Sequence, residues 1–115
     1  MPRAPDRLRF VFAGAFAITC VVHLVAVVHP GASPLRHAVF AGLNAVFAVL
    51  FARGARWVFF PLLALSLQQA YSHGKDLVEA ARRGEFDVQS ALVLVFLPLA
   101  LAYAWRWGSS ARPAP

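Results

Sequence analysis

The sequence predicts an all-α membrane protein, a bundle of four transmembrane helices with a short interfacial helix between the third and fourth. The composition is 60% hydrophobic and 14% charged, whereas charged residues make up about a quarter of an ordinary soluble domain. The apolar residues fall into four long segments, and the charged residues are concentrated between and beyond them. We therefore expect a single integral membrane domain over residues 1–115, with transmembrane helices at about 8–29, 35–53, 57–73 and 88–107.

The first apolar segment, residues 10–28, carries no charge and is close to the ~20 residues that a helix needs to cross a bilayer. A basic stretch precedes it, as in a signal peptide, but the apolar part of a signal peptide is shorter, about 7–15 residues. We therefore expect a retained helix. Cys20 is the single cysteine, which rules out an internal disulfide, and we expect it to pack as a small hydrophobic residue.

Proline, glycine and arginine residues separate the next two segments. Residues 29–34 contain two prolines and a glycine, which predicts a loop. The second segment follows over residues 35–52, and residues 53–56 form a tight basic turn. The third segment covers residues 57–73, and Pro61 falls in its first turns, where a missing N–H group costs least.

The connection over residues 74–87 carries most of the acidic side chains. Asp76 is followed three residues later by Glu79, a spacing typical of a capping box at the start of a helix. We therefore expect a short amphipathic helix over residues 76–84 that lies at the membrane interface. The fourth apolar segment begins directly after this connection and covers residues 88–107.

The distribution of Lys and Arg predicts the orientation, because cytoplasmic loops of membrane proteins are enriched in these residues. Four spans place both termini on one side, and seven of the eleven basic residues fall there: Arg3, Arg7, Arg9, Arg53, Arg56, Arg106 and Arg112. The other side holds Arg36, Lys75, Arg82 and Arg83. We expect a multi-pass protein of the inner (plasma) membrane with both termini in the cytoplasm. Although the net charge is +6, arginines at segment ends do not form the basic face of a nucleic-acid-binding protein.

Polar side chains of three segments fall at a similar depth, near the outer side of the membrane. His23 lies about 9 Å and Asn44 about 10 Å below the outer ends of their segments, at a rise of 1.5 Å per residue. In the third segment, Ser66, Gln69 and His73 share one helix face at i, i+3 and i+7. Because polar groups in hydrocarbon are costly and usually functional, we expect His23, Asn44, Gln69 and His73 to line an outward-opening pocket.

Two classes of function fit such a pocket. The first is a ligand-binding or accessory subunit that holds a quinone- or lipid-like ligand, or supports a membrane-protein partner or a second copy of itself. The second is a membrane redox protein or enzyme that uses His23 and His73 as metal ligands, haem ligands or acid/base groups. Asp76 and Asp87 flank the pocket mouth, where a carboxylate could orient an imidazole. A transporter subunit is less consistent with the sequence, because the inner half of the spans carries almost no polar residues.

A structural role remains an alternative for the same side chains. Asn, Gln and His between membrane helices often only hydrogen-bond one another, at about 0.6 kcal/mol per pair. In that case His29 and His37 would simply lie among the lipid headgroups.

The sequence also resembles the DoxX-like group of four-helix membrane proteins. The likeness covers Arg-Leu-Arg-Phe-Val-Phe-Ala-Gly at residues 7–14, Pro-Leu-Arg-His-Ala-Val-Phe-Ala-Gly-Leu-Asn at residues 34–44 and Ala-Tyr-Ser-His at residues 70–73. An acid often stands in that family where this chain has Asn44. Some members are the small membrane subunit of a thiosulfate:quinone oxidoreductase, so the resemblance implies a four-helix fold and a quinone-linked role.

Overall fold

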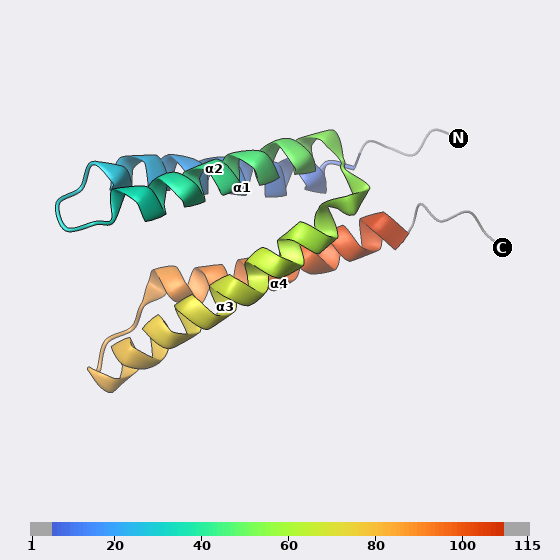
Figure 1. The fold of residues 1–115 in the computed structure, drawn as a ribbon. Coiled ribbons are helices and arrows are strands. Elements are labelled where there is room, and N and C mark those ends of the chain that lie inside the picture. The colour runs from blue at the N-terminus through green and yellow to red at the C-terminus, as the bar shows by residue number, and fades with distance from the viewer. Residues whose placement is uncertain (1–5, 110–115) are drawn as a thin grey trace, which may run out of the picture. The chain divides into compact units, whose positions relative to one another are not determined.

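The computed structural model describes residues 6–109, and within this range the chain is all-α and contains no strand. Four α-helices follow one another: α1 (Leu8–Val27), α2 (Pro34–Arg53), α3 (Phe59–Arg82) and α4 (Val88–Ser109), with a 3-10 turn at Arg56–Val58 before α3 (Figure 1). The all-α prediction is confirmed. The predicted orientation also used Arg3 and Arg112, which lie outside the described residues.

The chain divides into two compact units, Met1–Ala55 and Arg56–Pro115. In the first, α1 packs against α2, and in the second, α3 packs against α4 (Figure 1). We refer to these helix pairs as hairpin 1 and hairpin 2. The closed end of hairpin 1 is the turn over residues 28–33, and the closed end of hairpin 2 is the turn over residues 83–87. The single membrane domain over residues 1–115 stays a prediction.

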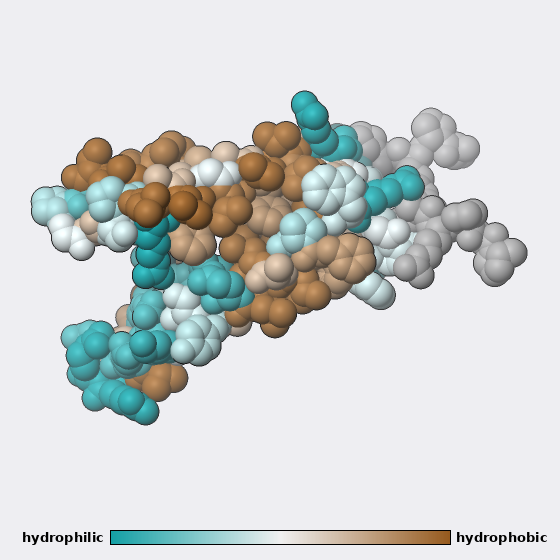
Figure 2. Space-filling view, in the orientation of Figure 1, coloured by the Kyte–Doolittle hydropathy of each residue, from teal (hydrophilic) through white to brown (hydrophobic). Residues whose placement is uncertain are grey.

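Three helices of the described chain, α1, α2 and α4, are long and apolar enough to cross a membrane, which fits a membrane protein. Their large apolar side chains are mostly exposed, as in Ile18 and Leu92, which a water-soluble fold would bury. Figure 2 shows hydrophobic side chains over the middle of the helices and hydrophilic ones gathered at the closed end of hairpin 2. The fourth helix, α3, is not among the candidate spans. Its middle third carries Gln68, Gln69 and His73, and its last third is charged.

The separate interfacial helix predicted over residues 76–84 is wrong, because α3 continues without a break through most of this segment. Asp76 and Glu79 therefore lie inside a helix rather than in a capping box. Gly74 does not interrupt the helix, since an isolated glycine costs only about 1 kcal/mol relative to alanine. The ion pair between Lys75 and Glu79, 3.9 Å apart at i, i+4, stabilises the helix by a few tenths of a kcal/mol and so offsets part of the cost of the glycine.

Aromatic stacking holds the two helices of hairpin 1 in register. The Phe16 side chain of α1 is 1% exposed and stacks on both Phe47 and Phe51 of α2, with ring centroids 5.4 Å away in each case. Phe12, one turn earlier, contacts Phe51 at 5.6 Å. Such aromatic pairs contribute about 0.5–1.5 kcal/mol each beyond their buried area, so rotation of α1 against α2 is opposed.

Local signals in the sequence fix both ends of α2. At the start, the Ser33 hydroxyl accepts a hydrogen bond from the Arg36 backbone N–H at 3.4 Å, and Pro34 occupies the first helical position. At the end, Gly54 adopts a left-handed φ of +66°, which closes the helix by returning its N–H to the Phe51 carbonyl.

Candidate functional site

In hairpin 1, two imidazoles are in direct contact near the closed end. The Nδ1 atoms of His23 on α1 and His37 on α2 lie 3.0 Å apart, which is hydrogen-bonding distance. The His23 ring also stacks on Phe40, with centroids 5.5 Å apart. One Nδ1 must donate and the other accept, so the neutral pair combines two different tautomers. One ring of the pair then has a lone pair at Nε2, and the other has a proton there.

The two histidines that the sequence placed at the outer boundary of hairpin 1 have different surroundings. His37 is half-buried against His23, whereas His29 is exposed in the turn. Asn44, also expected to line the pocket, is buried, and its Nδ2 donates to the Phe40 carbonyl of its own helix at 2.8 Å.

In hairpin 2, a chain of hydrogen bonds joins three residues from the two helices. The Asp87 carboxylate immediately precedes α4, and its Oδ1 accepts from the Ser90 backbone N–H at 3.0 Å. Its Oδ2 accepts from the Ser90 hydroxyl at 2.5 Å. The Ser90 Oγ lies 2.9 Å from His73 Nδ1, on α3.

The number of protons shared by Asp87, Ser90 and His73 determines which tautomer the neutral His73 ring adopts. A serine hydroxyl has one proton, and Ser90 gives it to Asp87, so Ser90 Oγ must accept from the Nδ1–H of His73. The neutral His73 ring therefore has its lone pair on Nε2. Orientation of an imidazole by a second group that is itself held by a carboxylate is common at sites where proteins bind ligands or move protons.

Asp87 is poised as an anion. The side-chain hydrogen bond from Ser90 is the largest cause that lowers the Asp87 pKa below its ordinary 3.8, followed by the Ser90 backbone N–H. When His73 is protonated, its positive charge lowers this pKa further. Near neutral pH Asp87 is thus a carboxylate, as its role as acceptor from Ser90 requires.

A stripe of polar side chains continues from His73 along α3. Gln69, one turn away, is buried, and its Nε2 donates to Gln68 Oε1 at 2.7 Å. Ser66 is also buried, and its Oγ is one of two buried side-chain atoms in the described residues that have no hydrogen-bond partner. An unsatisfied buried polar group costs about 1–3 kcal/mol. The stripe, defined as Ser66, Gln69 and His73, spans about 10 Å at 1.5 Å per residue.

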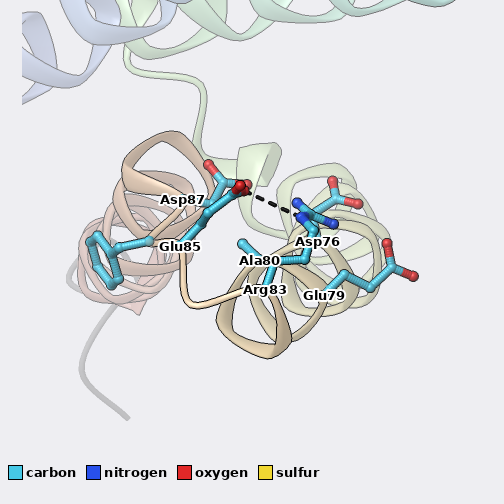
Figure 3. Close-up of a pocket in the computed structure, with 7 residues that line it drawn as sticks. Asp76, Glu79, Ala80, Arg83, Glu85 and Asp87 are labelled. Carbon is cyan, nitrogen blue, oxygen red and sulfur yellow. Dashed lines mark hydrogen bonds and ion pairs between the residues drawn. The ribbon is translucent and has the colours of Figure 1, made fainter.

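A cavity of about 380 Å³ opens at the closed end of hairpin 2. Figure 3 shows Asp76 and Glu79 of α3, with Arg83 directly after the helix, on one side, and Glu85 and Asp87 on the other. Arg83 Nε pairs with Glu85 at 3.2 Å. The cavity lining therefore has four carboxylates and one guanidinium. Sequence reasoning missed the cavity because it treated the acidic run as a solvated interfacial helix.

The four predicted pocket residues divide between the hairpins. His23 and Asn44 belong to hairpin 1, and Gln69 and His73 belong to hairpin 2, so the four-residue pocket stays a prediction. The partner that sequence reasoning missed in hairpin 2 is Ser90. The sequence feature that could have revealed Ser90 is its position three residues after Asp87. An aspartate directly before a helix is a typical N-cap, and its carboxylate accepts from the backbone N–H three residues later.

No cluster of three or more His, Cys, Asp or Glu residues that could hold a metal ion occurs within residues 6–109. Comparison with protein-family models, with curated proteins and with solved structures found no match. The likeness to the DoxX-like group therefore remains a resemblance.

Proposed function

We propose that this chain is a multi-pass inner-membrane protein that binds a quinone- or lipid-like ligand beside His73, as a ligand-binding or accessory subunit of DoxX-like type. The observation that supports it best is the hydrogen-bonded chain from Asp87 through Ser90 to His73. An imidazole that only joined two helices would need a single partner. Here a buried serine and a carboxylate together set its tautomer.

The chemistry of this arrangement suits a lipophilic ligand with a polar head. Because the His73 Nδ1 hydrogen-bonds to Ser90, a ligand that hydrogen-bonds to this ring would do so at Nε2. Neutral His73 accepts there from a hydroxyl, and the imidazolium donates there to a carbonyl. Ser66, whose buried hydroxyl has no partner, offers a further hydrogen bond two turns along the stripe. The exposed apolar helix surfaces suit a hydrocarbon tail.

The proposal requires α3 to cross the membrane beside α4. Before Lys75, α3 is uncharged over about 24 Å at 1.5 Å per residue, which is slightly less than the ~30 Å hydrocarbon core. Lys75 can extend its amine to the headgroups while its stem stays in the apolar layer. Because α3 packs against α4, which qualifies as a span, we expect both to cross, with both termini of the chain in the cytoplasm.

A second candidate function is a membrane redox protein or enzyme that uses histidines as metal, haem or acid/base groups. The contact between His23 and His37 favours it, because two imidazoles 3.0 Å apart hold one proton between them and such pairs suit proton exchange. A Soret band in the absorbance of the purified protein would support haem ligation. Elemental analysis would detect a bound metal.

Decylubiquinone binding tests the first proposal. We expect calorimetry in phosphatidylethanolamine and phosphatidylglycerol nanodiscs to show saturable binding, and His73→Ala to weaken it at least tenfold, or about 1.4 kcal/mol. His29→Ala is the matched control, since this exposed ring lies in a turn, and it should change affinity less than twofold. Equal effects of the two variants would contradict a site beside His73. A phospholipid retained in native mass spectra, without quinone binding, would identify the ligand as lipid.

A further inference from the structure

The hydrogen-bonded chain of hairpin 2 lies between an acid-lined cavity and the polar stripe of α3. Asp87 lines the cavity (Figure 3), and its Oδ2 accepts a hydrogen bond from the Ser90 hydroxyl. His73, whose orientation is set by its hydrogen bond with Ser90, is the first residue of the stripe, which continues to the buried side chains of Gln69 and Ser66. The three residues therefore connect the cavity to the face of α3 that carries the stripe.

We infer that Asp87, Ser90 and His73 form a proton path between the cavity at the closed end of hairpin 2 and the polar stripe of α3. The path deepens the proposed function and rests on it for the ligand that would exchange a proton with His73. It assigns no electron transfer, and the proton is the only particle that moves.

The distances and burial suit proton transfer along the chain. Donor and acceptor are 2.9 Å apart between His73 and Ser90 and 2.5 Å apart between Ser90 and Asp87, both within hydrogen-bonding range. Ser90 is 2% exposed, so bulk water does not reach the middle of the chain. A hydroxyl can accept one proton while it donates another, which makes serine a suitable central relay.

The steps balance with one proton in and one proton out. A proton taken up at Nε2 converts His73 to imidazolium. The Nδ1–H bond then breaks as Ser90 Oγ gains that proton, and the original Ser90 O–H proton passes to Asp87 Oδ2. Asp87, now a neutral acid, releases it to water in the cavity and becomes a carboxylate again. His73 is left neutral with its proton on Nε2, and the reverse sequence delivers a proton inward.

The charges around Asp87, at the cavity end of the path, favour proton exchange with water. The charged groups that line the cavity with Asp87 are three further carboxylates, Asp76, Glu79 and Glu85, and one guanidinium, Arg83. Arg83 pairs with Glu85, and Lys75 pairs with Glu79 from the same helix. An excess of negative charge remains in a concave site, which raises the local concentration of cations, including hydronium.

A purely structural role makes a different prediction. Asp87 also caps α4, because its Oδ1 accepts the Ser90 backbone N–H. Asparagine is as good an N-cap as aspartate, so Asp87→Asn keeps the cap but removes the carboxylate that takes the proton. If Asp87 only caps the helix, this variant should leave proton exchange at His73 unchanged.

Exchange of the His73 Nδ1 proton with water provides the test. We would label the full chain with 15N-imidazole histidine in nanodiscs and measure the exchange rate by solvent-exchange NMR. We expect Asp87→Asn and Ser90→Ala each to slow it at least tenfold, and Ser90→Thr, which keeps the hydroxyl, to stay within threefold of the unmodified protein. Asp76→Asn, which removes a carboxylate from the opposite wall of the cavity, should change the rate less than twofold.

Two results would overturn the path: a change below twofold in Asp87→Asn, or equal slowing in Asp87→Asn and Asp76→Asn. Circular dichroism at 222 nm checks that each variant is folded. Decylubiquinone titration of the same samples separates this inference from the proposed function. Binding with an unchanged exchange rate in Asp87→Asn rejects the path alone, whereas slowed exchange without binding supports the path and rejects quinone as the ligand.

Discussion

Ser66 and Ser90 are both buried serines of hairpin 2, and their hydroxyls have opposite surroundings. The Ser90 hydroxyl contacts Asp87 and His73, which lie on either side of it. The Ser66 hydroxyl has no hydrogen-bond partner. The first arrangement stabilises a fixed geometry, whereas the second leaves a polar atom available to a ligand. Burial alone would not distinguish the two serines, because both side chains are buried.

Spacing along the sequence predicted which polar residues share a helix face, but it did not predict their hydrogen-bond partners on other helices. The periodicity of one helix places Ser66, Gln69 and His73 on a common face. Which residue of α4 meets His73 depends on how α3 and α4 pack, and no local pattern encodes that register. For the same reason, the contact of His23 with His37 was not predicted, although both rings were placed in the outer half of the spans.

The lowered pKa of Asp87 predicts a pH dependence of stability. Its contribution should be present above the unfolded-state pKa of about 3.8 and be lost as the pH falls through the lower folded-state value. Thermal unfolding in detergent, followed by circular dichroism, should therefore show the unmodified protein to be more stable than Asp87→Asn at pH 6, with a difference that shrinks as the pH falls below the unfolded-state pKa. Asp76→Asn is the control and should show a smaller difference at pH 6. Equal pH dependence of the unmodified protein and Asp87→Asn would contradict the assignment.

At the scale of elements, α3 shows how tertiary context extends a helix. The sequence predicted an end near His73, because Gly74 and a run of charged residues follow. In the structure α3 continues to Arg82 and ends where Gly84 adopts a φ of +73°. Charged residues do not stop a helix when they form pairs on its surface, and one glycine is a small penalty. The other three helices were predicted to within about two residues, within the usual uncertainty of helix ends.

The aromatic stack of hairpin 1 predicts a large effect of a single truncation. Phe16→Ala removes a ring that is 1% exposed and leaves a cavity between α1 and α2, so we expect a loss of about 3–5 kcal/mol. Phe10→Ala is the control in the same helix, because its ring is 50% exposed, and it should cost less than about 1 kcal/mol. Steric trapping or SDS unfolding of the full chain would measure both. Similar losses in the two variants would contradict the role of the stack.

At the scale of the whole molecule, charge and apolar surface are segregated. Five of the eight described arginines lie at the open ends of the hairpins: Arg7, Arg9, Arg53, Arg56 and Arg106. The other three, Arg36, Arg82 and Arg83, lie toward the closed ends. The acids of the connection lie at the closed end of hairpin 2. Composition and segment length predicted the all-α class and four spans, and three helices are long and apolar enough to cross a membrane. The fourth span stays a proposal that rests on the packing of α3 against α4.

Cysteine labelling tests that fourth span. In a Cys20→Ser background, single cysteines at Ser33 and Glu85 should both react with an impermeant maleimide from the periplasmic side, and a cysteine at Ala55 should react only after the cytoplasmic side is exposed. If α3 does not cross, position 85 should share the behaviour of position 55. That result would contradict the four-span topology and the outward-facing cavity.

The division into two helix pairs has a consequence for biosynthesis. The first unit holds its own aromatic core and its own imidazole contact, so these contacts can form before the second unit is translated. At about 5–20 residues per second, a ribosome takes several seconds to add the second half. The nascent chain can therefore leave the translocon as one finished helical pair while the remainder is still being translated.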